Sequence, residues 1–281
     1  MFKILIYYVL ATNFYLTFQW KLIKDESNTR IMQGEQSKEG MFPYMASLMQ
    51  LRQHLCGVSI IGQFWALSAA HCVYDIETGN IADDKLLSIA VGNIHYRNGM
   101  IHQVQLKILH EGFNINEHVN DIMLIKVILP FVFSKTVQPL KIYPYPIDDY
   151  ETPVDAIVAG WGLNEESWKR TTPTATPEMR FAEVNTIPLP FCKTVYSMAN
   201  ETFSPSDSHI CVFTMVGRGT CTGDSGGPLV TPDGQIGILS VGGSCDNTIP
   251  EIYTRISSYY TWIKKALGDF NPVCEHIKTL L

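Results

Sequence analysis

The chain has 281 residues, 46% of them apolar and 17% charged, which suits one large domain or two halves of about 125 residues. This composition excludes a globally disordered chain. Twenty-one basic and 27 acidic residues give a net charge of −6, which argues against a nucleic-acid binder and against a polybasic membrane contact.

The N-terminus has the pattern of a secretory signal. A short basic start, Met1–Lys3, precedes seventeen uncharged residues, Ile4–Trp20. We predict a signal peptide over residues 1–20, with a cleavage point that the sequence does not fix. An uncleaved signal anchor is the alternative, and Thr12, Asn13 and Thr17 weaken it. The prediction is a secreted, extracellular chain, a compartment in which disulfides persist.

The cysteine count is odd. At least one cysteine is therefore unpaired or bonded to another chain, and six paired cysteines allow 15 connectivities. The seven are Cys56, Cys72, Cys192, Cys211, Cys221, Cys245 and Cys274. No C-x-x-C or H-E-x-x-H spacing occurs, so we predict no metal site and interpret His110 and His118 as surface histidines.

Short strands separated by turns are predicted between residues 31 and 256. In Gln103–Ile108 apolar and polar residues alternate, and Asp121–Val127 is a short apolar run. Leu229–Val230 and Ile236–Val241 flank a Pro-Asp-Gly turn and predict a hairpin. Because strands and helices do not alternate regularly, the pattern favours an all-β fold over a doubly wound sheet.

One helix is predicted near the C-terminus. A serine cap at Ser257 or Ser258 precedes apolar residues spaced i, i+3, i+4, i+7 and i+8, and Gly268 ends the pattern. The apolar residues are Tyr259, Trp262, Ile263, Ala266 and Leu267. Residues 139–153, with four prolines, predict a linker between two halves, residues 171–177 an exposed loop, and residues 269–281 a tail.

The most informative stretch is Gly223–Pro228, in which a serine stands between glycines. Glycine allows a sharp turn that exposes the Ser225 hydroxyl and leaves backbone N–H groups free. A serine nucleophile needs a base and a carboxylate that orients the base. His71, beside a cysteine, and Asp121, which opens an apolar run, are the candidates.

The same residues satisfy the G-x-S-x-G nucleophile elbow, which is the alternative interpretation. That elbow requires the order serine, aspartate, histidine and a following helix. Here the order is His71, Asp121, Ser225, and a strand follows the serine, so the elbow is disfavoured.

Five motifs together resemble the chymotrypsin-like (trypsin family) secreted serine endopeptidases. They are SAAHC (68–72), DIMLIK (121–126), GWG (160–162), GDSGGP (223–228) and YTRISSYYTWI (253–263). The resemblance covers residues 31–268. It implies two antiparallel six-stranded β-barrels, a C-terminal α-helix, and an active site in the cleft between the barrels.

The resemblance also implies roles for individual residues. His71 is the general base and then the general acid, Asp121 orients it, and Ser225 attacks the scissile carbonyl. The N–H groups of Gly223 and Ser225 form the oxyanion hole. The implied disulfides are Cys56–Cys72, Cys192–Cys211 and Cys221–Cys245. Cys274 has no partner in this scheme and is either a free thiol or bonded to another chain.

Activation by cleavage is implied as well. Arg30–Ile31 stands where zymogens of the family are cut, so residues 21–30 are the expected propeptide and 31–268 the protease domain. The new Ile31 amine is expected to pair with Asp224. Gln33 stands where the family has a glycine, which is a departure at the inserting segment.

Five residues are implied as the specificity pocket: Gly219, Thr220, Ser240, Gly242 and Glu251. Gly219 stands where trypsin-like members have an aspartate, so a plain trypsin specificity is not expected. We predict a large aromatic or aliphatic residue before the scissile bond, with basic or mixed basic and aromatic, and then small aliphatic, as alternatives. Glu251 either accepts a basic side chain, is neutralised by burial, or turns away.

No cofactor is predicted, and the absence of Asp and Glu from residues 91–110 argues against the calcium loop of some relatives. Asn200 is a glycosylation acceptor. Expected partners are protein and peptide substrates, an activating trypsin-like protease and protein inhibitors. We expect a monomer, with no nucleic acid and no membrane contact after processing. The competing class is a catalytically inactive homologue that acts as a binding or regulatory protein.

Overall fold

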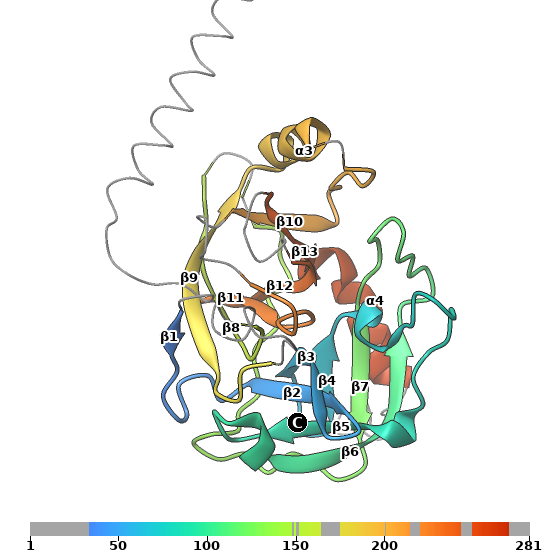
Figure 1. Ribbon diagram of the computed structural model, residues 1–281, viewed down its shortest axis with the longest axis vertical. Coiled ribbons are helices and arrows are strands. Elements are labelled where there is room, and N and C mark those ends of the chain that lie inside the picture. Colours follow the sequence, from blue (N-terminus) through green and yellow to red (C-terminus); the bar gives the residue numbers. More distant parts are fainter. Residues whose placement is uncertain are drawn as a thin grey trace, which may run out of the picture.

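The computed structural model describes residues 34–147, 149, 152–163, 175–199, 201–213, 220–242 and 249–269. Two barrels lie side by side, with a helix at the C-terminal end (Figure 1). The strands are β1 Glu35–Gln36, β2 Met45–Gln50, β3 Gln53–Ile60, β4 Trp65–Ser68, β5 Leu87–Val91, β6 Met100–Leu109, β7 Met123–Val127, β8 Asp155–Gly160, β9 Arg180–Ile187, β10 His209–Phe213, β11 Pro228–Thr231, β12 Gly234–Val241 and β13 Glu251–Arg255. The helices are α3 Leu189–Met198 and α4 Ile256–Asp269, with single 3₁₀ turns at Ala70–Val73, Asp84–Leu86 and Tyr96–Asn98.

The first barrel is closed by six antiparallel strands in the order β2-β3-β4-β7-β6-β5. The predicted apolar face of β6 points to its core, where Val104 is buried and Leu106 and Ile108 pack against the other core residues. β7 is the predicted apolar run. It pairs with β4 and β6, which brings the chain directly before it beside the end of β4.

The second barrel closes through the pairing of β8 with β9. The ring is β9-β10-β13-β12-β11-β8, and β1 adds a seventh strand along β9 within the described residues. The predicted hairpin is present as β11 and β12, joined at Pro232–Asp233. The fold is therefore the predicted all-β pair of barrels.

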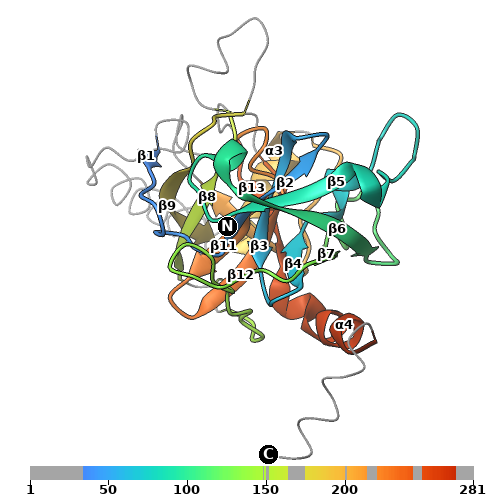
Figure 2. The same ribbon diagram turned by 90° about the horizontal axis from the view of Figure 1, so that it is seen from below.

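The C-terminal helix is confirmed, but its predicted serine cap is wrong. α4 begins at Ile256, directly after β13, so Ser257 and Ser258 lie in its first turn. Ile256 is fully buried in the core of the first barrel, and this packing carries the strand straight into the helix. α4 thus leaves the second barrel and packs against the first, near β4 and β7 (Figure 2).

A second helix, α3, was not predicted. Its buried residues Leu189, Cys192 and Tyr196 are spaced i, i+3 and i+7, which is a helical pattern. Pro188 directly precedes the helix and Pro190 lies in its first turn, where proline is tolerated. Neither α3 nor α4 is long and apolar enough to cross a membrane, and the described residues contain no other candidate span.

The predicted linker joins the barrels and contacts both of them. The Leu140 N–H donates to the Ile60 carbonyl in β3, at 2.7 Å, and the Tyr143 N–H donates to the Gln235 carbonyl in β12, at 3.0 Å. Asp149 is buried and pairs with Arg255 at 2.7 Å. The hydrogen bonds of Leu140 and Tyr143 thus tie the segment to both barrels.

Candidate active site

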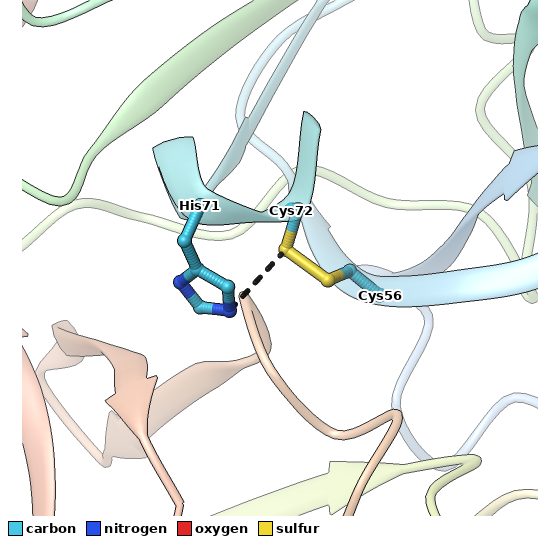
Figure 3. Close-up of side chains that lie close together, drawn as sticks. All are labelled: Cys56, His71 and Cys72. Atoms are coloured by element: carbon cyan, nitrogen blue, oxygen red, sulfur yellow. Dashed lines mark hydrogen bonds between the residues drawn. A yellow bond between two sulfur atoms is a disulfide. The ribbon is translucent and has the colours of Figure 1, made fainter. Parts of the chain in front are cut away.

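His71 lies on the 3₁₀ turn that follows β4. The neighbouring Cys72 is disulfide-bonded to Cys56 in β3, which ties this turn to the barrel wall (Figure 3). His71 Nε2 lies 4.0 Å from the Cys72 sulfur. The two sulfurs and the imidazole are close enough to suggest a metal site. Because both sulfurs are committed to the disulfide, they offer no thiolate, and the group does not fit a metal ion.

Asp121 holds the histidine by two hydrogen bonds. Its Oδ2 lies 2.7 Å from His71 Nδ1, and its Oδ1 accepts the His71 backbone N–H at 2.9 Å. Asp121 is fully buried, whereas the His71 side chain is 20% exposed. This pair fixes the ring orientation and leaves Nε2 as the nitrogen directed away from the carboxylate.

The electrostatics of the pair favour the ion pair over the neutral pair. Burial opposes a charge on His71, but the attraction and hydrogen bond of Asp121 outweigh it and raise the histidine pKa above its usual value. Burial likewise opposes ionisation of Asp121. The charge of His71 and hydrogen bonds from His71 and Ser240 outweigh it and lower the pKa of Asp121. A proton taken up at Nε2 is therefore stabilised.

The second barrel also positions Asp121. The Ser240 hydroxyl in β12 donates to Oδ2 at 2.5 Å, and the Thr254 hydroxyl in β13 donates to the Asp121 carbonyl at 2.8 Å. Ser240, expected in the pocket, thus contacts the carboxylate behind the histidine. Oδ2 accepts from two partners, one in each barrel, so the carboxylate is held across the junction.

Ser225 lies in a tight turn before β11. Its carbonyl accepts the Gly57 N–H at 2.8 Å, and the side chain is half-buried. Next to it, Gly226 has a φ of +76°, and a Cβ there would overlap the Ser68 hydroxyl and lie 3.1 Å from the Cys72 sulfur. The serine turn therefore packs against the same disulfide that anchors His71.

Within the described part of the chain, the Ser225 hydroxyl does not form a hydrogen bond with His71. The partner of Nε2 in this part of the chain is the Cys72 sulfur at 4.0 Å. Such contacts are often long without substrate and shorten when substrate binds. His71 is thus hydrogen-bonded directly to Asp121, and the Ser225 turn packs against the Cys56–Cys72 disulfide that anchors His71.

Asp224 is buried beside Ser225. Its Oδ1 accepts the Gly162 N–H at 2.8 Å and its Oδ2 the Cys221 N–H at 3.0 Å. Burial raises the pKa of Asp224 to about 6, against these two hydrogen bonds. No cationic side chain among the described residues pairs with it. Its expected partner Ile31 lies outside those residues.

The glycines of the GWG motif are explained by Asp224. A Cβ on Gly160 or Gly162 would overlap the Asp224 carboxylate. Trp161 is buried between them and donates its indole N–H to the Ile94 carbonyl at 2.7 Å. The two glycines therefore leave the space that the buried Asp224 carboxylate occupies.

Replacing Gly162 by alanine is expected to lower the free energy of unfolding by about 1–3 kcal/mol, because the new methyl group collides with a buried, hydrogen-bonded carboxylate. Gly62→Ala is the matched control, since a Cβ there meets no atom within 4 Å. We expect the control to stay within about 0.5 kcal/mol of wild type in urea unfolding. Equal stabilities for the two variants would contradict this explanation of the motif.

Three of the expected pocket residues, Thr220, Gly242 and Glu251, lie close together. Glu251, the first residue of β13, is fully buried, and its Oε1 accepts the Thr220 N–H at 2.6 Å. The Tyr253 hydroxyl donates to Oε2 at 2.9 Å. A Cβ on Gly242 would lie 3.5 Å from the Thr220 hydroxyl oxygen, so Gly242, Thr220 and Glu251 lie close together. Gly219 lies outside the described residues.

Burial has the largest effect on the pKa of the Glu251 carboxyl. It raises the pKa to about 7, against hydrogen bonds from Thr220 and Tyr253, and the charge of Asp224 raises it further. Burial therefore favours the neutral carboxyl at pH values below about 7. The two hydrogen bonds hold the Glu251 carboxyl in place.

Because of Glu251, the free energy of unfolding is expected to fall as pH rises. Its folded pKa, about 7, lies above the unfolded value of about 4.3, so between these values the folded chain binds more protons than the unfolded chain. The stabilisation of Glu251→Gln relative to wild type should therefore grow by up to about 3 kcal/mol between pH 5 and pH 8. Urea unfolding of both chains at several pH values measures this. A difference that is independent of pH would contradict it.

Two histidines near the site were not predicted to belong to it. His54 Nε2 donates to the Gly223 carbonyl at 2.7 Å, since a carbonyl only accepts, and Nδ1 therefore accepts from the Ser47 hydroxyl at 2.7 Å. Burial lowers the pKa of His54 to about 4, which keeps it neutral. His118, interpreted as a surface histidine, is half-buried, packs on Phe203, and lies close enough to His71 and Asp121 to feel their charges.

Two implied disulfides are present, Cys56–Cys72 and Cys192–Cys211. Cys221 is also disulfide-bonded. Several residues with sequence-based predictions fall outside the described residues, so the structure does not describe them: Arg30, Ile31, Asn200, Gly219, Cys245 and Cys274.

Comparisons with known proteins agree with this architecture. The trypsin family model matches residues 31–263. A trypsin from Phaedon cochleariae is 29% identical over 86% of this chain and 90% of that protein. Chymotrypsin-2 from Vespa crabro is 30% identical over 84% of this chain and 99% of that protein.

A solved structure shares the fold. It is neuropsin, a serine protease expressed in the limbic system of mouse brain, with a TM-score of 0.69 and 27% identity over 83% of this chain and 97% of that one. The chain therefore belongs to the trypsin family and is a serine endopeptidase, a hydrolase that acts on peptide bonds.

Proposed function

We propose that His71, Asp121 and Ser225 form the catalytic triad. The observation that carries this is the double hydrogen bond of Asp121 to His71, with the Ser225 turn packed on the same Cys56–Cys72 disulfide. In catalysis His71 Nε2 takes the hydroxyl proton while Ser225 Oγ bonds to the scissile carbonyl carbon. The leaving amine then takes that proton, and water releases the acyl group by the same steps.

The oxyanion hole is assigned to the N–H groups of Gly223 and Ser225. Neither group donates a hydrogen bond within the described part of the chain, and Gly223 has a φ of +100°. Donors that are free and fixed in place stabilise the charge that develops on the carbonyl oxygen. His54 and Gly57 fix this turn through the Gly223 and Ser225 carbonyls.

The chain is proposed to be made as a zymogen. Residues 1–20 direct secretion, and a trypsin-like protease removes residues 21–30 by cutting after Arg30. The Ile31 amine then pairs with Asp224, whose buried carboxylate gains stability from a cation. The protease domain, residues 31–268, acts as an extracellular monomer on protein substrates and is open to protein inhibitors.

For specificity we propose a large aromatic or aliphatic residue before the scissile bond. Both Glu251 oxygens accept hydrogen bonds, and burial favours the neutral carboxyl, which suits an apolar side chain. Mixed basic and aromatic preference is the second candidate, since the same carboxyl ionises at a pH above about 7.

A peptide-library cleavage profile of the chain that begins at Ile31 tests these proposals, with Ser225→Ala prepared identically. We expect cleavage by the wild type alone, mostly after Phe, Tyr or Leu. Cleavage mainly after lysine or arginine would overturn the specificity. A wild type with a free Ile31 that cuts nothing would favour the competing function, a binding protein.

A further inference from the structure

Two consecutive backbone amides connect the pocket to the serine turn. The Thr220 N–H donates to Glu251 and the next N–H, that of Cys221, donates to Asp224, at 2.6 Å and 3.0 Å. Both carboxyl groups are buried, with Glu251 0% and Asp224 3% exposed. They are close enough for the charge of Asp224 to raise the Glu251 pKa.

The segment between these amides and the nucleophile is a closed turn. The Asp224 N–H donates to the Cys221 carbonyl at 3.0 Å, and the Gly227 N–H donates to the Asp224 carbonyl at 3.0 Å. These bonds keep the shape of the turn, but they do not fix its position in the protein. Its position depends on bonds to other elements.

Those bonds come from both barrels. From the first barrel, His54 binds the Gly223 carbonyl and Gly57 binds the Ser225 carbonyl. From the second, Gly162 binds the Asp224 side chain and Glu251 binds the Thr220 amide at the N-terminal end of the turn. Glu251 is itself oriented by the Tyr253 hydroxyl of the same strand.

We propose that Glu251 is a positioning residue for residues 221–225, in addition to any effect on which side chain the pocket accepts. By holding the Thr220 amide it fixes where the turn begins, and hence where the Gly223 and Ser225 N–H groups point. The proposal rests on the proposed catalytic function of Ser225.

The test separates positioning from selectivity by using a reagent with no peptide side chain. The measurement is the second-order rate at which diisopropyl fluorophosphate inactivates the chain that begins at Ile31. Displacing oxyanion donors by about 1 Å costs about 100-fold in rate. We therefore expect Glu251→Ala to react about 10- to 100-fold more slowly than wild type. Glu251→Gln, whose amide oxygen still accepts the Thr220 N–H, should stay within about threefold.

The control is Glu183→Ala, which removes an exposed glutamate from β9 of the same barrel and should react at the wild-type rate. Glu251→Ala reacting like wild type, with only its peptide preference changed, would overturn the proposal. A wild type that does not react at all would instead overturn the proposed function.

Amide hydrogen exchange in the wild type keeps the proposal testable if Glu251→Ala does not fold. A buried amide bonded at 2.6 Å should be protected as strongly as the neighbouring Cys221 amide. Exchange of the Thr220 amide at the rate of exposed loop amides would overturn the proposal.

Discussion

Ser225→Ala is expected to lower kcat for a peptide substrate by about 10⁶-fold, because alanine offers no oxygen to form the acyl intermediate. Binding of the substrate should change little, since the pocket and the oxyanion N–H groups remain. Steady-state cleavage and equilibrium binding of one fluorogenic peptide, both on the chain that begins at Ile31, measure the two effects.

Two comparisons make this result specific. Ser197→Ala changes an exposed serine of α3 and should leave kcat unchanged. His71→Ala should match the loss of Ser225→Ala, and the double variant should lose no more than either single variant, because the two groups act as a unit. Losses that multiply in the double variant would show that Ser225 and His71 act independently.

Asp121→Asn is expected to lower kcat by about 10⁴-fold while the fold is retained. The carboxylate accepts the proton of His71 Nδ1 at 2.7 Å and so leaves Nε2 free to take the serine proton. The asparagine NH₂ group instead donates to Nδ1, which stabilises the tautomer with its proton on Nε2. Cleavage of the same peptide measures the loss.

Asp155→Asn is the matched control for this substitution, because Asp155 is an exposed residue of β8 in the second barrel. We expect it to cleave at the wild-type rate. If Asp121→Asn kept activity within tenfold of wild type, the assignment of Asp121 as the residue that orients His71 would be wrong.

Local patterns were enough to predict much of the fold. The spacing of Tyr259, Trp262 and Ile263 predicted α4, and the Pro-Asp-Gly turn predicted the β11–β12 hairpin. α3 was missed although its buried residues have helical spacing, and two prolines lie at its start. The two-barrel architecture was implied by the family resemblance alone, and the strand order was not predicted, since strand pairing joins residues far apart in the chain.

The site was predictable only where a motif marks it. His54 contacts Gly223 across 169 residues of sequence, and nothing near His54 signals that contact. The family resemblance assigned Glu251 to the pocket, but its ionisation state depends on burial and on a hydrogen bond from Thr220, 31 residues away. The glycines of GWG were recognisable as a motif, but the reason for them, the Asp224 carboxylate, appears only in three dimensions.

The most direct test of the proposed mechanism is to map the residue that diisopropyl fluorophosphate labels on the chain that begins at Ile31. Peptide mass spectrometry should find one phosphoryl adduct, on Ser225, and His71→Ala should prevent it, because the histidine activates that hydroxyl. An adduct on another residue, or an unlabelled wild type with a free Ile31 amine, would contradict the assignment of Ser225 as the nucleophile.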